Sequence, residues 1–178
     1  LEEETTEDME IMAGITPSEK TYFRSNPWEL YKHRIPWLLL LMVSATFTGI
    51  IITHFENALA AQVVLTAFIP MLMDTGGNSG SQASVTIIRG LSLNEIHFKD
   101  ILTVIWKEVR VAVLCGLSLS AISFLKLMVL DKVGMLVSLS VSLTLVVTVT
   151  IAKFIGCALP MFAKKLGFDP AVMASPFI

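Results

Sequence analysis

Charged residues are scarce in this chain of 178 amino acids. Only 16% of the residues are charged, whereas 54% are hydrophobic and the mean hydropathy is +0.72. Soluble domains carry about 25% charged and about 45–50% apolar residues. Because so little charge cannot solvate a globule and the apolar residues form long runs, the composition argues against an ordinary soluble domain. It predicts an all-helical integral membrane protein in a lipid bilayer, and we expect no nucleic-acid partner.

Cysteine is also rare. Cys115 and Cys157 both lie in apolar runs, and neither has a Cys or His at the spacing of metal ligands. The pattern therefore argues against a zinc site and favours two small packing residues.

Histidine is nearly absent from the apolar runs, which bears on one possible enzyme. Residues 77–80 read Gly-Asn-Ser-Gly and match the Gly-x-Ser-Gly pattern of intramembrane rhomboid proteases. A serine nucleophile of that kind needs a base, usually a His on a later membrane helix. No predicted span after Ser79 contains a His. We predict no catalytic residues and no enzymatic activity.

The long apolar runs predict four membrane spans and the start of a fifth. About twenty apolar residues cover the hydrocarbon core of a bilayer. Pro36 suits the first turn of the first helix, where its missing N–H is not needed. The predicted spans cover residues 36–55, 58–73, 111–130, 133–162 and, for the truncated fifth helix, 169–178.

Lysine and arginine alternate along the chain between segments that are rich and poor in bases. The rich segments precede the first span, connect the second to the third, and follow the fourth. The positive-inside rule then predicts a multi-pass protein of the plasma membrane with a cytoplasmic N-terminus. Residues 1–26 are polar, and six of the fifteen acids fall within the first ten residues. Because this start lacks both Met and the features of a signal peptide, we expect a cytosolic tail within a longer chain.

The stretch Pro70-Met-Leu-Met-Asp-Thr-Gly-Gly-Asn-Ser-Gly-Ser-Gln82 interrupts the second apolar run. Pro70 is expected to break the helix, and the glycines permit unusual backbone angles. Irregular backbone at membrane depth survives only when it is buried in protein or lines water. Oxygen-rich side chains suit a hard cation such as Mg²⁺, which usually keeps several of its waters. Two interpretations stay open: an ion site, or a surface loop whose glycines help helices pack.

Four further positions carry charge near or inside the spans. Asp74 is a candidate for direct contact with an ion, because intramembrane carboxylates are costly and usually functional. Glu108 is a candidate for an ion entrance. Lys153 is expected to extend toward the interface or to pair with an acid. Asp169 is expected to cap a helix whose first position is Pro170.

These motifs together resemble the membrane domain of the MgtE family of Mg²⁺ channels, in order and over nearly the whole chain. The resemblance is carried by residues 70–82, Ile88-Arg-Gly90, Lys107-Glu108, Leu159-Pro160, Lys164-Lys-Leu-Gly-Phe-Asp-Pro-Ala171 and Ser175-Pro176. It implies a homodimer of five-helix domains with the pore at the dimer axis. It also implies that residues 1–26 hold the end of a CBS domain, around Thr6-Glu-Asp8, and a linker, and that residues 27–178 form the membrane domain.

The resemblance further implies the residues of the ion path. Ser175 and Pro176 would face the path together with Asp74 and Asn78. Asn78, Glu108 and Asp74 would contact the metal, and the family's main pore aspartate is expected beyond Ile178.

The expected function is a Mg²⁺-selective channel that conducts the hydrated ion into the cytosol. Two alternatives remain: a secondary transporter that exchanges Mg²⁺ for Na⁺ or H⁺, and a membrane scaffold that transports nothing.

Overall fold

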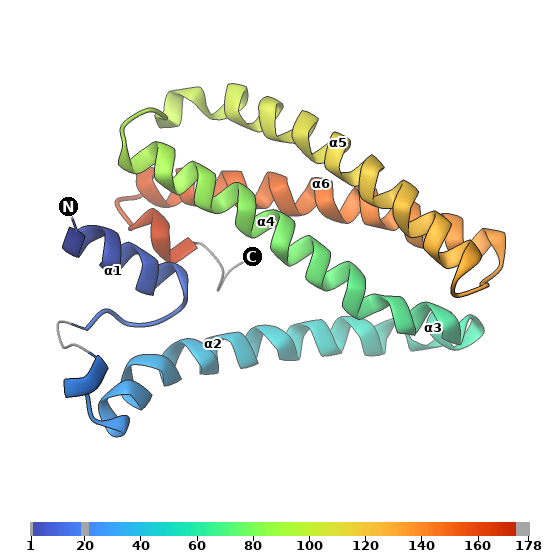
Figure 1. Cartoon of the computed structure of the whole chain (residues 1–178), viewed down its shortest axis with the longest axis horizontal. Helices are drawn as coiled ribbons and strands as arrows, with labels where there is room; N and C mark the ends of the chain where they lie inside the picture. Colours follow the sequence, from blue (N-terminus) through green and yellow to red (C-terminus); the bar gives the residue numbers. More distant parts are fainter. Residues whose placement is uncertain (1, 19–21, 174–178) are drawn as a thin grey trace.

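The computed structural model describes residues 2–18 and 22–173, and every regular element in these ranges is helical (Figure 1). In chain order the elements are α1 (Glu2–Met12), η1 (Tyr22–Arg24), α2 (Pro27–His54), α3 (Glu56–Ala61), η2 (Val63–Phe68), α4 (Ile69–Ser92), η3 (Phe98–Asp100), α5 (Ile101–Val129), α6 (Met135–Lys165) and η4 (Pro170–Met173).

Helix α6 is the centre of the packed part of the molecule. Both α4 and α5 pack along it, α4 running in the same direction and α5 in the opposite one. One apolar cluster, at the end nearest η3, joins Leu91 of α4 to Met161 of α6. A second cluster at the other end joins Phe68 to Val141. Between these two clusters, α4 and α6 approach each other through small residues.

Helix α2 lies apart from this bundle. Asn26 caps its N-terminus through a reciprocal capping box with Glu29, and Pro27 occupies the first turn. The capping box and Pro27 start the helix nine positions earlier than predicted, so Pro36 lies inside α2 rather than in its first turn. No residue of α2 is buried. An apolar helix exposed on all sides is stable only where lipid or other protein surrounds it.

Among the described residues, three helices are long and apolar enough to cross a membrane. They are Pro27–His54, Phe98–Val129 and Met135–Lys165, with mean hydropathies of 2.2, 2.0 and 2.2. They overlap the first, third and fourth predicted spans. Helix α4 is 24 residues long, which gives about 36 Å at 1.5 Å per residue, but its composition is more polar. Together with the family comparison reported below, these helices make the chain a membrane protein.

The prediction of a single apolar helix over residues 58–73 is wrong. The chain forms the short helix α3 and then the 3₁₀ segment η2, and the long helix begins only at Ile69. Pro70 fits the first turn of α4, where no intrahelical bond needs its N–H. Pro70 therefore lies at the start of a new helix, α4, and does not break a helix that begins at residue 58.

The base-rich segments lie at one end of the molecule. The N-terminus of α2, the connection from α4 to α5 and the C-terminus of α6 are found at that end (Figure 1). Lys164 and Lys165 fall in the last turn of α6, and Arg89 falls in the last turn of α4. Cations in the last turn interact favourably with the negative end of the helix dipole.

Candidate functional site

The glycine-rich stretch of residues 74–82 is helical from end to end. It lies in the middle of α4, so the prediction of irregular backbone in this stretch is wrong. A backbone that lipid surrounds must satisfy its polar groups internally, which favours the helix even where glycine is frequent. Because the backbone carbonyls serve the helix, only side chains of this stretch are left to meet an ion.

Glycines in this stretch allow α4 to approach α6 closely. A Cβ added to Gly156 of α6 would lie 2.3 Å from the carbonyl oxygen of Gly80. A Cβ added to Gly76 would lie 2.7 Å from the methyl group of Thr148. Small residues at such crossings let membrane helices pack backbone to backbone. Thus the surface-loop alternative was right about the packing role of glycine and wrong about the loop.

The outer side of α4 carries a row of polar residues. Asp74, Asn78 and Gln82 follow each other at intervals of four residues and are all exposed. Residues at this spacing lie on one face of a helix. We call these three residues the α4 polar stripe. Asp74 and Asn78, the two candidates in this helix, therefore share a face.

A groove of about 500 Å³ lies between α4 and α5, with α6 as its floor. Its lining, which defines the α4–α5 groove, consists of Thr75, Asn78, Ser79, Gln82, Leu114, Cys115, Ser118, Leu119 and Lys153. The wall on α4 carries amides and hydroxyls, whereas the wall on α5 is mostly apolar. Asn78 and Gln82 therefore belong both to the polar stripe and to one wall of the groove.

Lys153 forms part of the floor of this groove. Its side chain is only 5% exposed. Within residues 2–18 and 22–173, no carboxylate forms an ion pair with it. The expected pairing of Lys153 with an acid is therefore not found among these residues, and its extension toward the interface stays a prediction. The sequence did show a lysine inside an apolar helix, but nothing in it placed that lysine opposite Asn78 and Gln82.

Glu108 lies half-buried on α5, close enough to Cys157 of α6 for its charge to act there. No hydrogen bond or ion pair joins Glu108 to Asp74 or Asn78 in the part of the chain that the structure describes. That part also holds no group of three or more His, Cys, Asp or Glu residues able to bind a metal. The grouping of Asp74, Asn78 and Glu108 into one metal site therefore stays a prediction.

The predicted path residues Ser175 and Pro176 lie outside the described residues. The segment just before them starts as predicted. The carboxylate of Asp169 accepts a hydrogen bond of 2.8 Å from the backbone N–H of Ala171, and Pro170 opens the 3₁₀ segment η4. Among the described residues, this segment is the only part of the predicted fifth helix.

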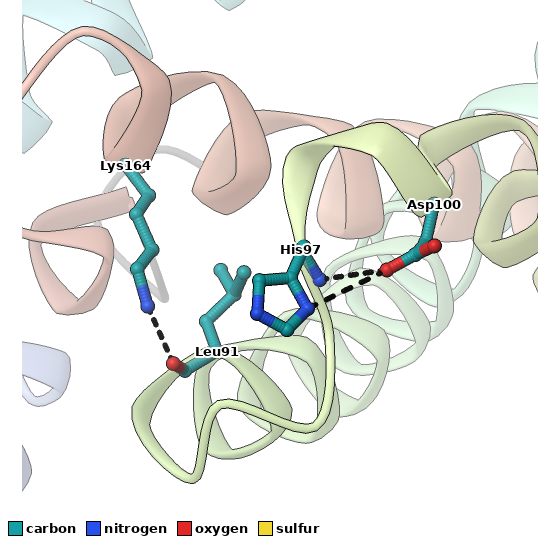
Figure 2. A network of polar contacts seen from close by, with 4 residues as sticks. All are labelled: Leu91, His97, Asp100 and Lys164. Atoms are coloured by element: carbon teal, nitrogen blue, oxygen red, sulfur yellow. Dashed lines mark hydrogen bonds and ion pairs between the residues drawn. The ribbon is translucent and has the colours of Figure 1, made fainter.

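Polar contacts hold the base-rich end of the bundle together (Figure 2). Lys164 of α6 donates a hydrogen bond to the carbonyl oxygen of Leu91, in the last turn of α4. Asp100 accepts a hydrogen bond from the backbone N–H of His97 and caps η3. The contact of Lys164 with Leu91 links the end of α4 to the end of α6, whereas the contact of His97 with Asp100 is local to η3.

The chain resembles known proteins both at the level of a family and at the level of individual relatives. The family model MgtE, described as divalent cation transporter, matches residues 69–178. A magnesium transporter MgtE of Thermus thermophilus is 33% identical over 178 residues, which is 100% of this chain and 39% of that protein.

Two further relatives with the same name come from other bacteria. The protein of Bacillus subtilis is 33% identical over 98% of this chain and 38% of its own length. The protein of Enterococcus faecalis is 28% identical over 100% of this chain and 38% of its own length. The chain thus spans about two fifths of the length of the relatives that it matches.

Proposed function

The chain belongs to the MgtE family of divalent cation transporters, and we propose that it forms the membrane part of a Mg²⁺ channel. The observation that supports this most strongly is the α4 polar stripe. A carboxylate and two amides lie exposed on a helix that packs against the apolar membrane-spanning helix α6. Polar side chains at membrane depth usually face a water-filled cavity or the interior of a bundle. A stripe of this kind suits one wall of an aqueous ion path.

The chemistry of the stripe suits a hydrated divalent ion. Mg²⁺ prefers oxygen ligands and gives up its waters reluctantly. The Asp74 carboxylate attracts the ion, and the amide oxygen of Asn78 accepts hydrogen bonds from its waters. Keeping the hydration shell avoids the barrier of removing it. The ammonium of Lys153 at the floor of the α4–α5 groove repels cations from the groove, so the proposed path follows Asp74 and the outer side of Asn78.

The remaining parts of the proposal concern assembly and orientation. A stripe exposed on one chain forms a closed path only when a second surface faces it, and a homodimer with the path at its axis supplies one. Ser175 and Pro176 would line the path, and Glu108 would lie at its entrance. With the base-rich end in the cytoplasm of a plasma-membrane protein, the N-terminus of α2 is cytoplasmic.

Growth of a bacterium that lacks Mg²⁺ uptake tests the proposal. The full-length protein is expected to restore growth at low external Mg²⁺, and Asp74→Ala or Asn78→Ala is expected to abolish this rescue at equal membrane expression. Leu143→Ala is the matched control, because Leu143 is an exposed apolar residue of α6. Rescue by both stripe variants at the level of the control would refute the assignment of the path to α4.

A further inference from the structure

The ammonium of Lys153 has no balancing charge in the described chain. Its side chain is 5% exposed, and no hydrogen bond or ion pair joins it to any described residue. An ammonium group offers three donors and no acceptor. Lys153 lines the α4–α5 groove, so its unpaired charge faces a space that a ligand can enter. The groove therefore presents a cation to an anion from outside the described residues.

The α4–α5 groove combines two kinds of wall around that charge. On α4, Asn78 and Gln82 offer amide N–H donors beside the ammonium. On α5, Leu114 and Leu119 form an apolar surface. Donors and a cation suit the head of an anionic ligand, whereas the leucines suit a hydrocarbon tail. The groove therefore fits an amphiphile rather than a bare inorganic ion.

The depth of Lys153 in the bilayer fits the head group of a lipid. Lys153 lies eighteen residues after Met135, the first residue of α6, which corresponds to about 27 Å of helix. The hydrocarbon core is about 30 Å thick. If α6 enters the core near Met135, Lys153 lies just inside the opposite boundary. Arg110, nineteen residues before the end of α5, reaches about the same level. Phosphate groups of phospholipids lie at this boundary.

We propose that the α4–α5 groove binds an anionic glycerophospholipid from the leaflet at the base-rich end. The Lys153 ammonium donates to the phosphate oxygens, and the amides of Asn78 and Gln82 add further donors. One acyl chain lies against Leu114 and Leu119. The site shares Asn78 and Gln82 with the α4 polar stripe, but the proposal rests on the charge and shape of the groove and does not require that the chain transports an ion.

Native mass spectrometry of the full-length protein in detergent tests the site. Phosphatidylglycerol is titrated against phosphatidylethanolamine, and the retained lipid is counted for each variant. Lys153→Met is expected to weaken the binding of phosphatidylglycerol by about fivefold or more, the effect of one ammonium beside an anionic lipid surface. Lys153→Arg keeps the charge and should retain most of the binding. Lys99→Met is the matched control, because Lys99 is an exposed cation at the same end of the bundle.

Three results would overturn the proposal. The first is unchanged preference for phosphatidylglycerol in Lys153→Met. The second is equal loss in Lys99→Met, which would indicate attraction to the surface in general. The third is binding of inorganic phosphate, in lipid-free detergent, that is as strong as the binding of phosphatidylglycerol. That result would assign the site to a soluble anion. If Lys153→Met does not fold, Leu114→Trp fills the apolar side of the groove, and unchanged lipid binding in that variant would also contradict the site.

Discussion

Replacement of Gly156 by alanine probes the contact that fixes α4 against α6. The added Cβ would lie 2.3 Å from the carbonyl oxygen of Gly80, whereas ordinary contact begins at 3.4 Å. The nearest atoms belong to backbone, so no side-chain rotation relieves the overlap and the two helices must separate by about 1 Å. A gap of 0.5–1 Å removes roughly a quarter to a half of each dispersion contact along the interface.

The expected result is a loss of about 1–3 kcal/mol in the free energy of unfolding, the usual range for overpacking. This loss appears even though alanine has the higher helix propensity, worth about 0.8–1 kcal/mol. Gly77→Ala is the matched control, because Gly77 lies in the helix α4 and nothing lies within 4 Å of an added Cβ. Unfolding of the detergent-solubilised protein, followed by the exposure of buried Cys157 to a thiol reagent, measures both variants.

The two variants are expected to shift stability in opposite directions. Gly77→Ala should gain stability from propensity alone, and Gly156→Ala should lose it through the steric overlap. Equal or higher stability of Gly156→Ala would refute the close approach of α4 and α6, and with it the placement of the α4 polar stripe on the outer side.

Three smaller changes follow from other contacts. Gly76→Ala should destabilise less than the change above, because its Cβ would meet only the methyl group of Thr148, and adding Thr148→Ser should restore most of the loss in the same unfolding assay. Lys164→Met removes the hydrogen bond to the carbonyl of Leu91 and should lower the unfolding free energy by about 1–2 kcal/mol, with an unchanged value counting against this link. Asn26→Ala removes the cap of α2 and should cost about 1 kcal/mol, seen as faster amide hydrogen exchange in its first turn but not in α6.

The long helices followed from the sequence because apolar length alone determines them. Helix α6 covers the fourth predicted span except for its first two residues, and α5 covers the third except for its last residue. Their starts were harder to predict, because local capping decides them. The capping box of Asn26 starts α2 well before the apolar run, and residues 101–110, which precede the predicted third span, belong to the same helix as that span.

The conformation of residues 74–82 could not be predicted from composition. Glycine lowers helix propensity in water, so the stretch was predicted to be irregular. The gain that outweighs this preference is the contact of Gly80 with Gly156, which is 76 positions away in the chain. A contact between such distant residues leaves no local signal.

The sequence allowed us to predict which residue types belong to the candidate site, but not which of these residues lie together in the structure. Asp74 and Asn78 were found from their chemistry, and the four-residue spacing places both on one face of the helix. The charge of Lys153 in the groove was missed, since its position depends on how α4 and α5 both pack on α6. Within one chain the structure does not bring Glu108 to the stripe, so its role stays a prediction.

The central claim is that hydrated Mg²⁺ passes along the α4 polar stripe. Mg²⁺ influx into liposomes containing the full-length protein tests it most directly, with the wild type compared with Asp74→Ala, and with Na⁺ and K⁺ fluxes measured in the same vesicles. We predict Mg²⁺ influx that exceeds Na⁺ and K⁺ fluxes and falls to the level of empty liposomes in the variant. Equal passage of all three ions, or full Mg²⁺ influx without the Asp74 carboxylate, would contradict the account.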